Sequence, residues 1–178
     1  LMLALGIIII YSFFFFFIIL FSLGQLALLI TFLTYRNKEN HKITLNTYPN
    51  ITIQLPIYNE RYVIERLLDS ISKLNYPKNK LEIQVLDDSD DDTSIIVEQK
   101  VKKLIALGFT IAQIKRKNRI GFKAGALQNG LIQAASEFIV IFDADFVPDP
   151  DFLINTLPYF SNDKIGMVQT RWGHINPR

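Results

Sequence analysis

The chain has 178 residues, of which 49% are hydrophobic and 20% charged, and this length allows one domain of ordinary size with a short appendage. Its net charge of +2 is too close to balance to favour a nucleic-acid partner, and the absence of cysteine excludes disulfides, thiolate metal sites and cysteine nucleophiles. The two histidines, His41 and His174, are far apart in the sequence, which argues against a zinc site built on them.

The first predicted element is a transmembrane helix over residues 1–35. No Asp, Glu, Lys or Arg occurs in this segment, and it is longer than the roughly 20 apolar residues that cross a bilayer as a helix. The alternative, a cleaved signal peptide, would show a cationic start, a shorter apolar core and a small-residue cleavage site, and none of these is evident. We therefore expect a single membrane span.

A basic juxtamembrane linker is predicted over residues 36–49. Arg36, Lys38 and Lys42 follow the apolar segment closely, against the single acidic Glu39. Since segments rich in Lys and Arg tend to stay on the cytoplasmic side, this excess predicts that the following domain faces the cytoplasm. The protein is then expected in an inner, plasma or Golgi-type membrane.

Residues 50–178 alternate strand and helix patterns. Apolar runs or apolar alternation indicate strands at 51–57, 81–86, 109–114, 137–142 and 164–170. Apolar residues at helical spacing indicate helices between these strands. The alternation predicts an α/β fold with a mainly parallel, Rossmann-like sheet covered on both faces, in which ligands bind at the carboxyl ends of the strands.

Capping residues predict where the helices begin and end. We expect Asn59 to cap the first helix of this domain and Gly108 to end the second. A third helix is expected over 122–135, and a fourth after Pro148. Helical spacing predicts that the second helix buries Ile95, Ile96, Val101, Leu104 and Ile105.

Two carboxylates follow the strand predicted at 137–142. Asp143 and Asp145 flank Ala144, a small residue that leaves room for a ligand. Oxygen ligands of this kind suit Mg²⁺ or Mn²⁺, which keep open positions for diphosphate oxygens. A solvated turn before Pro148 is the alternative, but an apolar strand delivers both carboxylates to the ligand-binding edge, which favours a metal site.

Five aspartates lie within residues 87–92, at the end of the second predicted strand. Helix capping explains Asp91 and Asp92, because acids complement the positive end of a helix. That reason does not extend to Asp88, whose carboxylate can accept a hydrogen bond from the imide N–H of uracil or from guanine. Base recognition by Asp88 is therefore expected, with capping and solvation as the alternative.

A group of cations surrounds Gly121 near the start of the third predicted helix: Arg116, Lys117, Arg119 and Lys123. Cations are unfavourable at a helix N-terminus unless an anion is near, and such a terminus is itself an anion site. A diphosphate would be that anion. An exposed basic loop is the alternative for Arg116 and Lys117, whereas the helix fixes the position of Lys123.

Taken together, these motifs resemble the family 2 glycosyltransferases, and within them the membrane-bound cellulose-synthase-like and mannan-synthase-like branch. The resemblance extends over about residues 51–176, and the matching stretches are 54–60, 85–89, 119–127, 142–148 and 168–172. It implies a GT-A fold, here incomplete, behind one N-terminal span. It also implies inverting transfer of a hexose from a UDP- or GDP-sugar, for polysaccharide synthesis.

The resemblance also implies site residues. It places Pro56, Tyr58, Glu60, Asp88, Lys123 and Asp143 at the nucleotide sugar, and Asp143 and Asp145 at a Mg²⁺ or Mn²⁺ ion. The residues themselves leave Glu60 open to a second interpretation, as an acid in the first turn of a helix.

The sequence departs from the family pattern at its end. Complete members continue to a Thr-Glu-Asp type motif with the general base, to a Gln-x-x-Arg-Trp motif at the acceptor site, and to further spans. Residues 169–172 have one residue too few between Gln and Arg for that acceptor motif. No Asp or Glu follows Asp163, so we expect the general base beyond Arg178 and donor binding without turnover by these residues.

Three other functions stay open. The acceptor can be a lipid instead of a polysaccharide, or the chain can be an inactive nucleotide-binding protein. Phosphatases of the haloacid-dehalogenase type also place Asp-x-Asp after an apolar strand, with the first Asp as nucleophile. Three strands are predicted before the one that ends at Asp143, whereas that motif normally ends the first strand of its domain, which argues against the phosphatase.

Overall fold

The computed structural model describes residues 2–35, 47–171 and 173 of the chain. The chain consists of two compact units, residues 1–42 and 43–178. Most of the predicted linker, residues 36–46 of 36–49, lies outside the described residues. The linker and the membrane orientation that it implies therefore stay predictions.

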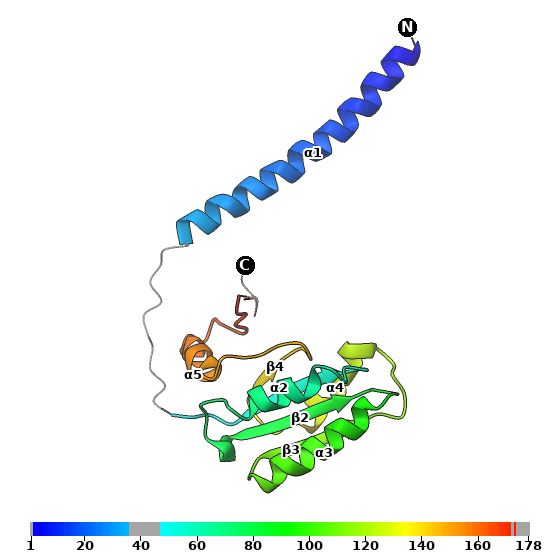
Figure 1. The fold of residues 1–178 in the computed structure, drawn as a ribbon. Helices are drawn as coiled ribbons and strands as arrows, with labels where there is room; N and C mark the ends of the chain where they lie inside the picture. Colours follow the sequence, from blue (N-terminus) through cyan, green and yellow to red (C-terminus); the bar gives the residue numbers. More distant parts are fainter. Residues whose placement is uncertain (1, 36–46, 172, 174–178) are drawn as a thin grey trace. The chain divides into compact units, whose positions relative to one another are not determined.

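The first unit contains one long helix, α1 (Met2–Tyr35), drawn in blue in Figure 1. Its 34 residues span roughly 50 Å, more than the roughly 30 Å of a bilayer's hydrocarbon core. By length and composition, Met2–Thr34 is able to cross a membrane. The helix expected at 1–35 is present, and its insertion in a membrane stays a prediction.

The second unit is built on a parallel sheet of four strands. These are β1 (Ile51–Ile57), β2 (Leu81–Asp87), β3 (Thr110–Lys115) and β4 (Phe138–Ile141). They pair in the order β3-β2-β1-β4, and each of the three pairs is parallel. The prediction of a mainly parallel α/β sheet is confirmed.

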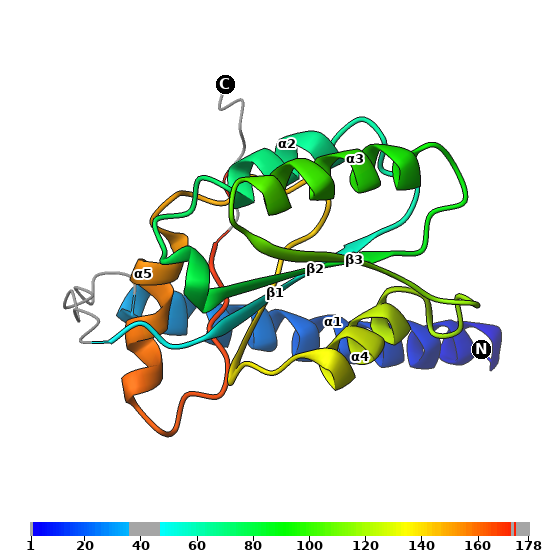
Figure 2. The ribbon, with the colours of Figure 1, turned by 90° about the horizontal axis from the view of Figure 1, so that it is seen from below.

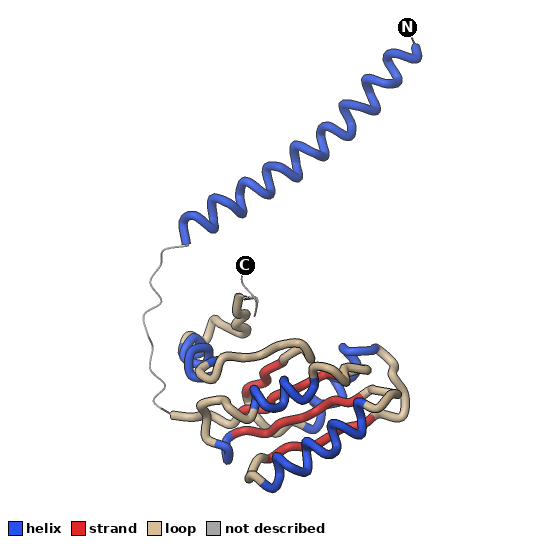
Figure 3. Tube along the Cα trace, in the orientation of Figure 1, coloured by secondary structure: helices blue, strands red, loops and turns tan. Residues whose placement is uncertain are grey.

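Helices cover both faces of this sheet (Figure 2). The helices α2 (Ile64–Ile71) and α3 (Thr93–Ala106) lie on one face, and α4 (Phe122–Gln133) lies on the other. The remaining elements are short: the 3₁₀ turns η1 (Lys78–Lys80) and η2 (Leu157–Ser161), and α5 (Phe152–Thr156). Figure 3 shows loops joining these elements, with the strands in the middle.

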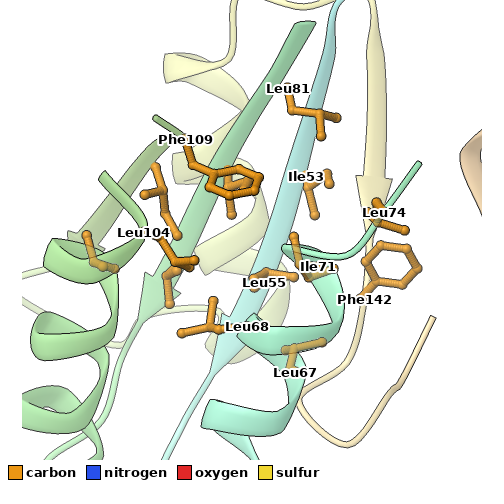
Figure 4. Close-up of a cluster of buried hydrophobic side chains, with 14 of the residues drawn as sticks. Ile53, Leu55, Leu67, Leu68, Ile71, Leu74, Leu81, Leu104, Phe109 and Phe142 are labelled. Atoms are coloured by element: carbon orange, nitrogen blue, oxygen red, sulfur yellow. The ribbon is translucent and has the colours of Figure 1, made fainter. Parts of the chain in front are cut away.

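The hydrophobic core lies between the sheet and the pair α2 and α3. Strand residues alternate between the two faces, so Ile53 and Leu55 of β1 point to this side, where they meet Leu68 and Ile71 of α2 and Leu104 of α3 (Figure 4). All of these are buried. The strands are thereby held in fixed register, which fixes where their carboxyl ends lie.

The opposite face of β1 and β2 is polar under α4. Gln54 is fully buried and donates a hydrogen bond to Gln84 on the neighbouring strand, with 3.1 Å between Nε2 and Oε1. A Cβ at Gly130 of α4 would come within 2.6 Å of Gln54 Nε2 and 2.8 Å of Gln84 Oε1. Gly130 therefore lets the helix approach this pair of amides.

Several expected boundaries are wrong in detail. Residues 164–170 form no strand, because none of them pairs with a strand in the described part of the chain. Asn59 does not cap α2, which begins at Ile64, because its backbone is left-handed at φ 58° and its side chain turns to Asp90. The expectation for α3 fails at Ile95 and Ile105, whose side chains are exposed.

Candidate functional site

The candidate site lies where the four parallel strands end. The chain leaves β1 at Tyr58, β2 at Asp88, β3 at Arg116 and β4 at Phe142. A backbone hydrogen bond of 3.1 Å from Asp88 N to Ile57 O continues the β1–β2 pairing by one residue. The loops after β1 and β2 therefore start side by side, as ligand-binding loops do in open parallel sheets.

These two loops are tied together by Asn59. Its backbone N–H donates to Ser89 Oγ at 3.0 Å, and its side-chain amide donates to Asp90 Oδ1 at 2.7 Å. Asp90 N–H returns a bond of 3.1 Å to Asn59 Oδ1, and the Tyr58 hydroxyl reaches Asp90 Oδ2 at 3.3 Å. Asn59 and Asp90 hold the loops in place, and the loops in turn hold Tyr58.

The five aspartates at the end of β2 have different tasks. Asp87 is buried and accepts hydrogen bonds from Ser89 N at 2.9 Å, from Gln113 Nε2 at 2.7 Å and from the Ser94 hydroxyl. These neighbours lie on β3, on α3 and in the loop, so the buried Asp87 carboxylate joins three structural elements.

Asp91 marks the start of α3. Its carboxylate accepts a hydrogen bond of 2.9 Å from Thr93 N, and the hydrogen bonding from Thr93 lowers the pKa of the Asp91 carboxyl. Asp92 occupies the N-cap position of α3 but makes no capping hydrogen bond with its side chain. The capping role expected for the two residues is thus carried by Asp91 alone.

Asp88 is held by Arg116. Arg116 Nε donates to Asp88 Oδ1 at 2.9 Å, and Arg116 Nη2 donates to Asp88 Oδ2, so the guanidinium binds both carboxylate oxygens. The side chain of Arg116 is 12% exposed and that of Asp88 is 7% exposed. The hydrogen bond to Asp88 raises the pKa of Arg116. The alternative of an exposed basic loop is wrong for Arg116.

Arg119 lies beside the same carboxylate and over an aromatic ring. Its Cζ is 3.1 Å from the centroid of the Tyr58 ring, and its Nε is 4.0 Å from Asp88 Oδ2. Arg119 Nε is buried and has no hydrogen-bond partner in the part of the chain that the structure describes. Tyr58, Asp88 and Arg119 thus form one group in which a donor N–H is unused.

The other half of the edge is formed by the start of α4 and the end of β4. Lys123, in the first turn of α4, makes an ion pair with Asp143 Oδ1, and both side chains are about half exposed. Asp145, two residues further on, is exposed. The structure therefore brings Lys123 and Asp143 into contact, and leaves the Asp145 carboxylate in solvent.

Two further predicted site residues have backbone roles. Pro56 is paired in register with Leu86 within the sheet. The Glu60 carbonyl accepts hydrogen bonds of 3.1 Å from Val63 N and Ile64 N at the start of α2. The Glu60 side chain is half-buried, and its proposed contact with a nucleotide stays a prediction.

The acidic residues at β4 suit a small divalent cation only in part. Among the described residues, no group of three or more His, Cys, Asp or Glu side chains could surround a metal ion. Asp143 and Asp145 supply two accessible carboxylates. Mg²⁺ and Mn²⁺ sites of nucleotide enzymes commonly have one or two carboxylates, with substrate phosphates and water as the other ligands, so the pair fits such an ion.

The sequence does not predict the partnership of Arg116 with Asp88. Its patterns predict a diphosphate contact for Arg116 and a base contact for Asp88. The signal was the cation directly after β3, since in a parallel sheet that position lies next to the end of β2. Lys117 is exposed, as the alternative of an exposed basic loop predicts.

Comparisons with known proteins identify relatives of this chain. The model of the family "Glycosyl transferase family 2" matches residues 52–178. Glucomannan 4-beta-mannosyltransferase 1 of Cyamopsis tetragonoloba is 43% identical over 134 residues, which are 72% of this chain and 26% of the relative. Glucomannan 4-beta-mannosyltransferase 2 of Arabidopsis thaliana is 38% identical over 143 residues, covering 78% and 27%. The chain thus spans about a quarter of the length of these curated relatives.

Solved structures show the same fold. The mannosyltransferase PcManGT from Pyrobaculum calidifontis, in complex with GDP-Man and Mn²⁺, is 30% identical, with a TM-score of 0.69 over 84% of this chain and 44% of that one. The TarS 1–349 structure of S. aureus is 28% identical, with a TM-score of 0.52 over 58% of this chain and 30% of that one. The expected GT-A type fold, present here in part, is confirmed.

Proposed function

Because the chain belongs to glycosyltransferase family 2, we propose that it forms the donor-binding part of a membrane-bound enzyme that transfers a hexose from a nucleoside diphosphate. GDP-mannose is the first candidate donor and a UDP-hexose the second. The observation that carries the proposal is the meeting of Tyr58, Asp88, Lys123 and Asp143 at one edge of the sheet. The mannosyltransferase relatives and the complex with GDP-Man and Mn²⁺ support the choice of donor.

In this proposal the nucleobase binds at the ends of β1 and β2. Each oxygen of a carboxylate has two acceptor positions, so Asp88 can bind an N–H of the base while Arg116 holds it. The Tyr58 ring offers a surface for stacking. The unused N–H of Arg119 beside Asp88 suits a carbonyl oxygen of the same base edge.

The diphosphate then lies over the start of α4. Free N–H groups at a helix N-terminus attract anions, and Lys123 adds a positive charge in that first turn. Asp143 and Asp145 would hold Mg²⁺ or Mn²⁺, which neutralises charge on the departing diphosphate. Lys123, which pairs with Asp143, can bind a phosphate oxygen once the cation is on the carboxylate.

The reaction in this proposal is inverting transfer to a hydroxyl group of a polysaccharide. An acceptor hydroxyl attacks the anomeric carbon, the bond to the diphosphate breaks, and a general base removes the hydroxyl proton. None of the described residues is assigned that role. The names of the glucomannan-synthesising relatives favour a polysaccharide over a lipid acceptor.

The long apolar helix α1 is the basis for the proposed membrane location of the enzyme. We propose that α1 crosses the membrane and that the sheet domain lies on the cytoplasmic side. Its apolar sequence over Met2–Thr34 supports the span, and the basic residues after it support the orientation.

Calorimetric titration of the detergent-solubilised chain tests the proposal. We expect GDP-mannose or UDP-glucose to bind in the presence of Mn²⁺ and to lose most of that affinity when EDTA removes the metal. Binding of neither nucleotide sugar would contradict a donor site. Hydrolysis of a simple phosphate ester would instead support the phosphatase alternative.

A further inference from the structure

Arg116, which binds Asp88, is 12% exposed and makes further hydrogen bonds to the backbone. Besides the two bonds to Asp88, its Nη1 donates to Ile120 O at 2.9 Å and its Nη2 donates to Phe122 O at 3.0 Å. The guanidinium has five N–H groups, and four of them are used in these bonds. Little donor capacity is left for a ligand.

The two carbonyl partners belong to an unusual turn. Gly121 and Phe122, at the start of α4, both have a positive φ, of 74° and 48°. A left-handed backbone is costly for a residue with a side chain such as Phe122. Hydrogen bonds from Arg116 to the carbonyls of Ile120 and Phe122 compensate for part of this cost and fix the path of the chain into α4.

Gly125 provides the space for this guanidinium. A Cβ at Gly125 would lie 2.7 Å from Arg116 Nη1 and 2.1 Å from the carbonyl oxygen of Ile120. Both distances are well inside van der Waals contact, so no larger residue fits while Arg116 and the turn keep their positions. The seat of the guanidinium is therefore built by α4 as well as by β3 and the end of β2.

We propose that Arg116 is a positioning residue for nucleotide recognition: it orients the Asp88 carboxylate toward the base and fastens it to the turn that begins α4. The proposal rests on the proposed donor site. Arg116 acts through Asp88 and the turn, and does not touch the nucleotide itself. The base-binding and diphosphate-binding parts of the site are thereby held at a fixed distance from each other.

The geometry predicts that lysine does not replace Arg116. A lysine ammonium is a compact charge without the planar fork of donors that binds two carboxylate oxygens and two carbonyl oxygens here. Arg116→Lys therefore keeps the positive charge and loses the orientation of Asp88. The conservative exchange thus separates orientation from charge.

A double-mutant cycle with Asp88→Asn tests the proposal. The affinity for GDP and for UDP is measured by calorimetry with Mn²⁺ on the solubilised full chain, with Arg116→Lys made in the native and in the Asp88→Asn background. We expect Arg116→Lys to weaken nucleotide binding about 10-fold in the native background, and only about 2- to 3-fold, through the loosened turn alone, when Asp88 is already changed. Arg66→Lys, an exposed arginine of α2, is the matched control and should change neither value.

Three results would overturn the inference. Equal weakening in both backgrounds would mean that Arg116 acts independently of Asp88, and no weakening in either would mean that its orientation of Asp88 is irrelevant. If the native chain binds neither GDP nor UDP, the proposed donor site fails and the inference fails with it. Because native binding is measured first, the two failures are distinguishable.

Gly125→Ala gives a second test in which residue 116 stays an arginine. The added methyl group displaces the guanidinium from its seat, so we expect a loss of nucleotide affinity similar to that of Arg116→Lys. Unchanged affinity in a folded Gly125→Ala chain would contradict the proposed seat. Gly166→Ala, with open space around its Cβ position, is the control.

Discussion

The two halves of the candidate site differ in how completely they are formed without a ligand. At the ends of β1, β2 and β3, Asp88 is nearly buried and both of its oxygens are bound by Arg116. At the start of α4 and the end of β4, Lys123 and Asp143 are about half exposed and share one ion pair, and Asp145 is exposed. The first half is already formed in the folded chain, whereas the second is open to solvent, and we propose that a metal ion and a diphosphate bind there.

The largest expected effect is a loss of stability in the half of the site at the ends of β1, β2 and β3. Asp87→Ala removes a buried carboxylate and leaves the N–H groups of Ser89 and Gln113 without their acceptor. We expect the free energy of unfolding to fall by about 3 kcal/mol, measured by urea denaturation.

Asp92→Ala is the control for that measurement. The Asp92 side chain is 75% exposed and contacts Arg61 at 3.8 Å, so its loss should change the free energy of unfolding by less than about 0.5 kcal/mol. Equal effects of the two substitutions would contradict the structural role of Asp87.

The second prediction concerns the open half. Asp143→Asn and Asp145→Asn each remove one negative charge from the proposed metal site, and we expect the affinity for GDP with Mn²⁺ to fall roughly 100-fold for each. The free energy of unfolding should change little in both variants, because both residues are solvent-accessible. Asp163→Asn, at another exposed aspartate, should leave binding unchanged. Unchanged GDP affinity in both site variants would contradict metal binding by Asp143 and Asp145.

The sequence predicts some features of these two halves and not others. The four strands, their parallel orientation and the edge where the polar residues gather follow from apolar patterns, because those patterns reflect burial in the sheet. The pairing of Arg116 with Asp88 could not be read from them, since it depends on the path of the turn at Gly121 and Phe122 and on the space at Gly125.

The same limit explains the errors outside the site. Asn59 has the side chain of a helix cap, but the loop after β2 offers it Ser89 and Asp90 as partners, and these tertiary contacts decide its conformation. Residues 164–170 have an apolar pattern, but a strand needs a neighbour and none of the described strands pairs with them.

A third and smaller effect distinguishes base from diphosphate binding. Tyr58→Ala removes the stacking surface, so we expect GDP affinity to fall about 10-fold and the affinity for inorganic pyrophosphate with Mn²⁺ to stay the same. Tyr62→Ala is the matched control, because its ring is 87% exposed in the same loop. If Tyr58→Ala weakens pyrophosphate and GDP equally, the base does not stack on this ring.

The smallest expected effect is the contribution of Asp91 to the pH dependence of stability. The pKa of Asp91 is lowered in the folded chain, chiefly by its hydrogen bonding with Thr93. A carboxyl with a lowered folded pKa contributes stability above its unfolded pKa, near 3.9, and that contribution is lost as the pH falls through the folded value. Asp91→Asn should therefore flatten the loss of stability below about pH 4. If the free energy of unfolding of Asp91→Asn falls with decreasing pH as steeply as that of the native chain, other carboxylates cause the acid sensitivity.

Amide hydrogen exchange, with and without GDP and Mn²⁺, tests whether a nucleotide and a metal ion bind together at the strand ends. We expect the two ligands together to slow exchange in residues 57–60 and 87–91 and in residues 119–125 and 142–147, with the larger change in the open half. Slower exchange confined to other segments, or the same protection by GDP after EDTA treatment, would contradict a metal-assisted donor site at the ends of these strands.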